Sequence, residues 1–148
     1  MIEKTNSRFY TTAKQAEVLL NAFNVDPDTA DCYLILVKSG DEVSFEQHII
    51  PDFVDFSELA AEYDAQLIPC WSINALLSVL PQSLIIWDDD AGRNGKNVEF
   101  NLRYSPGRIS YESLEEDRIL LEEVNMEFPI NAIISMFTKV KNFLPKED

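Results

Sequence analysis

The clearest pattern along the chain is an apolar stripe at helical spacing near the amino terminus. From Ala16 to Phe23, apolar residues recur at i, i+3, i+4 and i+7. The stripe follows residues 12–15, whose Thr-x-x-Gln order has the form of a capping box. These features predict a helix over residues 13–23, and the Asn, Asp and Pro residues at 24–28 end it.

Two further stretches carry the same spacing. Ser72 is a good N-cap for a predicted helix over residues 72–80, which Pro81 terminates. Pro129 suits the first position of a last helix over residues 129–141, with lysines at its carboxyl end. A weaker pattern at residues 57–63 allows one more short helix.

Other segments have the composition or the period of strands. Residues 32–37 are apolar, aromatic and β-branched, which predicts a largely buried strand. A turn around Gly40 leads into residues 43–48, where polar and apolar side chains alternate. Together they predict a hairpin with one face in water.

A second hairpin is predicted in the other half of the chain. A strand at residues 84–87 runs into a polar loop, and residues 98–104 then alternate. Pro106 and Gly107 occupy the positions that a type II turn favours, and the alternation continues at residues 109–111. Residues 119–124 extend the pattern by one strand.

These elements predict an α+β fold. Hairpin connections dominate, so we expect an antiparallel sheet of about five or six strands with roughly three helices packed on it in two layers. The length fits a single domain over residues 1–148, with 1–10 as a loosely ordered arm and 145–148 as a tail. No internal repeat is evident.

Charge narrows the range of partners. The chain carries 26 acidic and 12 basic residues, a net charge of −14, which disfavours direct binding to nucleic acid or to an anionic membrane. Its start lacks the pattern of a signal peptide, and no apolar run is long enough to span a bilayer. The two cysteines lie in apolar stretches, as reduced buried thiols do. We therefore expect a cytoplasmic protein.

The acidic surplus is concentrated in residues 26–64, which hold eleven acids against Lys38. Such a surface is either solvated or a face that recognises a protein, and in a sharper version its carboxylates imitate DNA phosphates and inhibit a DNA-binding protein. The candidate acidic face consists of Asp41, Glu42, Glu46, Asp52, Asp55, Glu58 and Glu62.

Three short motifs stand out by residue type and spacing. The first comprises Thr29, Ala30, Asp31 and Tyr33; the second comprises Pro69, Trp71, Ser72, Leu77, Leu80 and Pro81; the third is Pro-Ile-Asn-Ala at 129–132. With them the chain resembles a family of short proteins from Bacteroides-type gut bacteria and their phage-like or mobile elements. No activity is established for that family, so the resemblance implies a setting rather than a function. The chain departs from the family pattern at Cys70, where alanine is usual, and lacks a tryptophan in the last helix.

Candidate catalytic chemistry is sparse. Cys70 precedes a predicted helix, where a thiolate could be stabilised, but a nucleophile needs a base and the single histidine, His48, has no sequence relation to it. The aspartates at 88–90 do not fit a calcium loop, because Arg93 stands where glycine is required. Residues 29–31 are expected to satisfy backbone donors. We predict no catalytic residue, no metal site and no cofactor.

The hypothesis that follows is a non-enzymatic interaction or accessory protein with a protein partner. The DNA-mimic inhibitor and an enzyme that uses Cys70 stay open as alternatives. The oligomeric state is open as well.

Overall fold

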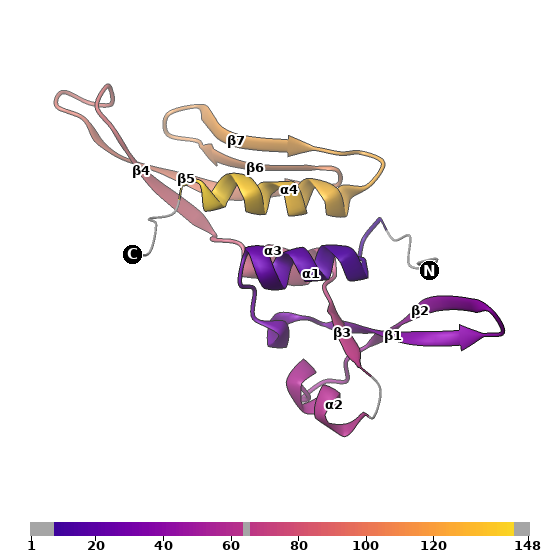
Figure 1. Ribbon diagram of the computed structural model, residues 1–148. Coiled ribbons are helices and arrows are strands. Elements are labelled where there is room, and N and C mark those ends of the chain that lie inside the picture. The colour runs from indigo at the N-terminus through magenta and orange to yellow at the C-terminus, as the bar shows by residue number, and fades with distance from the viewer. Residues whose placement is uncertain (1–7, 64–65, 144–148) are drawn as a thin grey trace. The chain divides into compact units, whose positions relative to one another are not determined.

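The computed structural model describes residues 8–63 and 66–143. Its contacts divide the chain into two compact units, Met1–Val79 and Leu80–Asp148, and each is described by itself. Figure 1 shows that each unit has its own sheet and its own helices.

The first unit is built on a three-stranded antiparallel sheet in the order β2-β1-β3. The strands are β1 (Cys32–Ser39), β2 (Glu42–Ile49) and β3 (Leu67–Cys70). β1 is the central strand, and its Cys32 lies opposite Ile49 of β2 on one side and opposite Cys70 of β3 on the other. Beyond β3, β1 and β2 continue as a two-stranded arm that carries the turn at Gly40 (Figure 1).

The helices of the first unit are α1 (Ala13–Ala22), α2 (Phe56–Glu62) and α3 (Ile73–Val79), with a short 3-10 turn η1 (Pro27–Thr29). The predicted capping box is confirmed: the Thr12 hydroxyl accepts from the Gln15 amide at 3.1 Å, and the Gln15 side chain accepts from the Thr12 amide at 3.0 Å. A small core gathers Cys32, Leu34 and Cys70, on which Tyr10, Ala13, Phe45 and Ile68 pack.

Residues 9–11 run antiparallel to residues 71–73. The Thr11 amide donates to the Trp71 carbonyl at 2.9 Å, and the Ile73 amide donates to the Phe9 carbonyl at 3.1 Å. Residues 9 and 10, the last two of the predicted arm 1–10, are therefore paired with the segment 71–73. Residues 1–7 of that arm, and the tail 145–148, lie outside the described residues.

The second unit is a four-stranded antiparallel meander with one helix. Its sheet order is β4-β5-β6-β7, and α4 packs against β6 and β7. The elements are β4 (Ser83–Asp88), β5 (Lys96–Ser105), β6 (Arg108–Ser113), β7 (Arg118–Val124) and α4 (Pro129–Lys141). The predicted turn between β5 and β6 is present, and Gly107 has a φ of +85°. A Cβ there would come within 2.5 Å of the Met126 sulfur, so glycine is required on two counts.

The α+β class is confirmed, but the arrangement differs from the prediction. Instead of one sheet of five or six strands, the described residues form two sheets of three and four strands, with four α-helices rather than three. The strand missed by the pattern is β3, which has four residues, one of them Pro69. A segment that short has no measurable period. The single domain stays a prediction.

None of the helices among the described residues has the length and apolar character needed to cross a bilayer.

Candidate functional site

The first two sequence motifs meet in the first unit. The Asp31 carboxylate accepts from the Ser72 amide at 2.9 Å and from the Ser72 hydroxyl at 2.5 Å. The Thr29 hydroxyl accepts from the Trp71 indole at 2.9 Å and donates to the Asp26 carbonyl at 2.6 Å. Side chains 40 residues apart thus fasten the start of β1 to the start of α3, and the structural role expected for residues 29–31 is found.

The remaining motif residues are packing positions. Ala30, Tyr33, Pro69, Trp71 and Leu80 are buried, whereas Leu77 and Pro81 are half-buried. The Tyr33 ring stacks on His48, and the Pro81 carbonyl accepts from the Tyr111 hydroxyl at 2.7 Å. None of these contacts suggests a reactive group.

Sequence reasoning missed Thr11, which is fully buried. Its hydroxyl accepts from the Trp71 amide at 2.9 Å, and its carbonyl accepts from the Cys70 thiol at 3.3 Å. A threonine before a helix gives no signal of this long-range role, because its partners are about 60 residues away.

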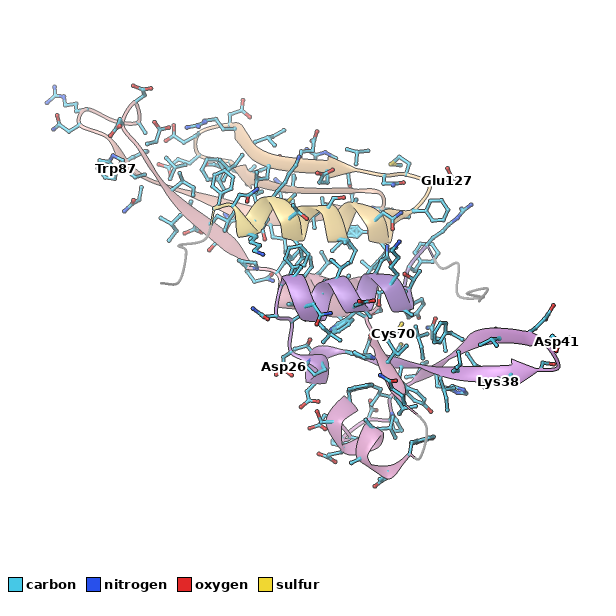
Figure 2. All side chains as sticks on the ribbon, in the orientation of Figure 1. Asp26, Lys38, Asp41, Cys70, Trp87 and Glu127 are labelled. Atoms are coloured by element: carbon cyan, nitrogen blue, oxygen red, sulfur yellow. The ribbon has the colours of Figure 1, made fainter. Side chains whose placement is uncertain are left out.

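The structure does not assemble a dyad from Cys70 and His48. Cys70 lies opposite Cys32, whereas His48 lies opposite the next residue, Tyr33. Neighbouring residues of a strand point to opposite faces of the sheet, so the thiol and the imidazole lie on different faces. Cys70 is fully buried, as Figure 2 places it inside the first unit.

The protonation of the two thiols agrees with a packing role. The interaction with the neighbouring Cys70 side chain lowers the pKa of Cys32. The same interaction, together with burial, raises the pKa of Cys70. This direction favours the neutral thiol at Cys70 over a thiolate.

The aspartates of the β4–β5 loop are engaged with the protein itself. The Asp88 carboxylate accepts from the Arg118 guanidinium and from the Asp90 amide, the latter at 2.9 Å. The Asp89 carboxylate accepts from the Trp87 indole at 2.5 Å. Among the described residues, no group of three or more acidic, histidine or cysteine side chains is placed to hold a metal ion.

The seven candidate acidic residues do not form one continuous ridge. Asp41, Glu42 and Glu46 belong to the β1–β2 hairpin, whereas Asp52, Asp55, Glu58 and Glu62 lie in or just before α2. Figure 1 shows the hairpin and α2 projecting from the sheet in different directions. Figure 2 shows Asp26 and Asp41 at opposite ends of the first unit.

Some of these carboxylates have local structural roles. Asp55 caps α2 by accepting from the Glu58 amide at 2.9 Å, and Glu46 contacts the His48 imidazole at 2.6 Å. Outside the candidate set, Asp28 accepts from the amide and the hydroxyl of Ser57. Continuous spacing of the DNA-phosphate kind is not found.

The first unit has an open groove of about 690 Å³ that could receive a ligand. Five elements supply its walls: most of the lining comes from α1 and β3, and η1, β2 and α2 each contribute one residue, Pro27, Phe45 and Phe56. The α1 residues are spaced along one helical face, and the groove is lined by Ala13, Lys14, Glu17, Leu20, Asn21, Pro27, Phe45, Phe56, Gln66, Leu67, Ile68 and Pro69. Its size is that of a small-molecule or short-peptide site.

Polar groups lie at the rim of the groove. Lys14 and Glu17 are exposed on α1, and neither forms an ion pair with a described residue. Pro27 and Phe56, which line the groove, are sequence neighbours of Asp26, Asp28 and Asp55. The charged residues that line the groove itself are Lys14 and Glu17.

Comparisons of the chain with protein-family models, with curated proteins and with solved structures give no match in any of the three.

Proposed function

We propose that the chain is a non-enzymatic interaction protein that binds a short protein segment in the groove beside α1 and β3. The observation that carries the proposal is the groove itself, which is walled mainly by apolar side chains, and no metal-binding cluster is found among the described residues. Clefts with apolar walls and a few polar rim groups are where proteins bind ligands. As a wider setting we propose an accessory role in the cytoplasm, in a phage-like or mobile element.

The charge around the groove defines the chemistry of the partner. Residues 26–64 carry a net charge of −10, and Asp26, Asp28 and Asp55 are next in sequence to the groove residues Pro27 and Phe56. A segment with apolar anchors and basic flanks would bury its anchors against Phe45, Leu67 and Leu20. Its lysines or arginines would lie near the carboxylates, which speeds association and selects against acidic competitors.

The DNA-mimic alternative is favoured less by the geometry. A mimic needs carboxylates repeated along one ridge, and the acids here are divided between a hairpin and α2. Direct binding to nucleic acid or to a membrane is also disfavoured by the net charge of −14.

A synthetic peptide tests the proposal directly. The probe is a fluorescein-labelled peptide with two leucines and a phenylalanine between lysines, followed by fluorescence anisotropy. We expect saturable binding that weakens as salt is added. A second peptide with glutamate in place of lysine should not bind.

Two substitutions on α1 locate the site. Leu20 lines the groove, whereas Val18 is exposed on the same helix and does not line it. Leu20→Lys should weaken binding about tenfold, equivalent to about 1.4 kcal/mol. Val18→Lys adds the same charge and should leave binding unchanged. Equal binding by both variants, or no saturable binding by the native chain, would overturn the proposal.

A further inference from the structure

β4 forms one edge of the sheet in the second unit and has little of the usual protection against pairing. In the order β4-β5-β6-β7, β4 has a neighbour on one side, and no described strand pairs with its other side. Figure 1 shows β4 and β5 extending as a long hairpin. Edge strands of this kind are templates for pairing with another chain unless charges, proline or a covering element blunt them.

The alternation of backbone groups along β4 shows which N–H and C=O groups face away from β5. The Gln82 carbonyl accepts from the Leu102 amide of β5 at 2.9 Å, so the backbone of residue 82 points toward β5. Backbone groups alternate along an antiparallel strand. Ser83, Ile85 and Trp87 therefore direct three N–H and three C=O groups away from β5, where the described residues give them no ladder partner.

Side-chain composition separates β4 from the other edges. Residues 83–87 carry no charge and no proline, in a chain whose net charge is −14. The opposite edge of the same sheet, β7, contains Glu122 and Glu123. In the first unit, the edge strand β3 contains Pro69 and β2 contains Glu42 and Glu46. Three of the four edges have a recognised protective feature within the strand, whereas the only charge on β4 is Asp88 at its end, which is paired with Arg118.

Two of the three side chains on the open face of β4 are apolar, and one of these is held in place. Ile85 is 62% exposed and Trp87 is 56% exposed. The Trp87 indole donates to Asp89 at 2.5 Å and lies so close to Gly95 that a Cβ there would be 2.7 Å from the ring. An exposed tryptophan with a fixed orientation is typical of interface anchors, because little entropy is lost on binding. Figure 2 labels it on the hairpin.

We propose that a second copy of this chain pairs with β4, antiparallel and with the two-fold axis at Ile85. In that register Ser83 lies opposite Trp87 of the other copy, and all six outward backbone groups form hydrogen bonds. On the open face Ile85 meets Ile85, and on the opposite face Leu84 meets Ile86. The two four-stranded sheets become one of eight strands.

Electrostatics favours this register despite the acidic composition. Asp88, the nearest acid on β4, lies opposite Gln82 and is already paired with Arg118. Glu99 lies opposite Ile85 on β5, so the two copies of Glu99 are three strand spacings apart, about 14 Å. That distance exceeds the Debye length of about 8 Å at physiological salt. The ladder thus brings no like charges into contact.

A self-complementary strand favours a second copy over an unrelated peptide, because a two-fold axis places identical uncharged residues against each other. The groove of the first unit takes no part in this pairing. Failure of one proposal therefore leaves the other standing.

Sedimentation velocity of the full chain tests the pairing. We expect a concentration-dependent species of twice the 16.9 kDa chain mass, more populated as salt screens the net charge. Ile85→Lys should raise the dissociation constant at least about tenfold. Ile119→Lys is the matched control, since Ile119 is 54% exposed on β7, the other edge, and should leave the dimer unchanged.

Cysteine cross-linking tests the register. The native cysteines are buried, so a new surface thiol reports on its own neighbours. Ile85→Cys should form an intermolecular disulfide on mild oxidation, because directly opposed residues lie within disulfide distance. Trp87→Cys should not, since its partner is Ser83. A chain that stays monomeric at all concentrations, a dimer lost through Ile119→Lys instead, or cross-linking at residue 87 rather than 85 would each overturn the proposal.

Discussion

In the first unit, individual polar side chains form hydrogen bonds between segments that are far apart in the sequence. Thr29 and Asp31 hold Trp71 and Ser72 across about 40 residues of sequence, and Thr11 holds the backbone of Trp71. A fully buried indole needs an acceptor, because leaving its N–H unpaired in the interior costs free energy. Thr29 supplies that acceptor.

Removing the Thr29 hydroxyl should destabilise the protein. Thr29→Val keeps the shape of the side chain but leaves the Trp71 indole without its acceptor, so the free energy of unfolding should fall by about 1–3 kcal/mol. Urea unfolding monitored by circular dichroism measures it. Thr29→Ser retains the hydroxyl and should recover most of the loss. An equal loss in both variants would assign the effect to the methyl group instead.

At this scale the sequence predicted a structural role for residues 29–31 without revealing their partners. Short polar side chains between a helix and a strand are recognisable, but the residue that they bind is set by the path of the chain. The same limit applied to Cys70. Its position before a helix left a stabilised thiolate open, and the sequence did not show that Cys70 would lie buried opposite Cys32 in the sheet.

At the scale of elements, one face of the second sheet carries an ionic network across β6 and β7. Arg108 pairs with Glu112 of its own strand and with Glu122 of β7, and Glu112 also accepts from the Ser110 hydroxyl. The Ser110 hydroxyl and the Arg108 guanidinium lower the pKa of the Glu112 carboxyl. The stability that Glu112 contributes to the pairing of β6 and β7 should therefore depend on pH.

The pH dependence of this network follows from that direction. A carboxyl whose pKa is lower in the folded state stabilises the fold above its ordinary pKa, and the contribution is lost as pH falls through the lowered value. Glu112→Gln should therefore cost stability at pH 7, by less than about 1 kcal/mol because the pair is near the surface, and cost less at acid pH. Denaturant midpoints at both pH values measure the change. An equal penalty at the two values would indicate packing rather than charge.

Helices and long hairpins were predictable because each repeats its period several times. The limits of α1, α3 and α4 agree with the apolar stripes to within one residue, and the capping box marked the start of α1. In the β1–β2 hairpin and the β4–β7 meander, β2, β5 and β6 were predicted by alternation, whereas β1 and β4 were predicted as short apolar runs. The groove had no such signal, because it combines residues of α1 and β3 with single residues of η1, β2 and α2.

For the whole molecule, the surplus of acid is the dominant long-range term. The seven ion pairs formed by described residues involve four of the basic residues and His48, so most carboxylates repel one another without local compensation. Self-repulsion of this kind destabilises a compact state.

Added salt should therefore stabilise the protein. Raising NaCl from about 10 mM to about 150 mM shortens the Debye length from roughly 30 Å to 8 Å and should raise the Tm by a few degrees. Differential scanning fluorimetry at low protein concentration measures it. A variant with Asp41→Asn, Glu42→Gln and Asp52→Asn should start from a higher Tm and gain less. A Tm that does not depend on salt would contradict this account of the charge.

The sequence by itself determined the local conformations and the charge: where the helices begin and end, which strands form hairpins, and that the chain repels polyanions. These properties depend on residues close in sequence or on a sum over all of them. Tertiary structure decided how the strands divide into two sheets, which residues line the groove and which edge stays unpaired. Those outcomes depend on contacts between residues far apart in the chain, and no local period encodes which distant segments will meet.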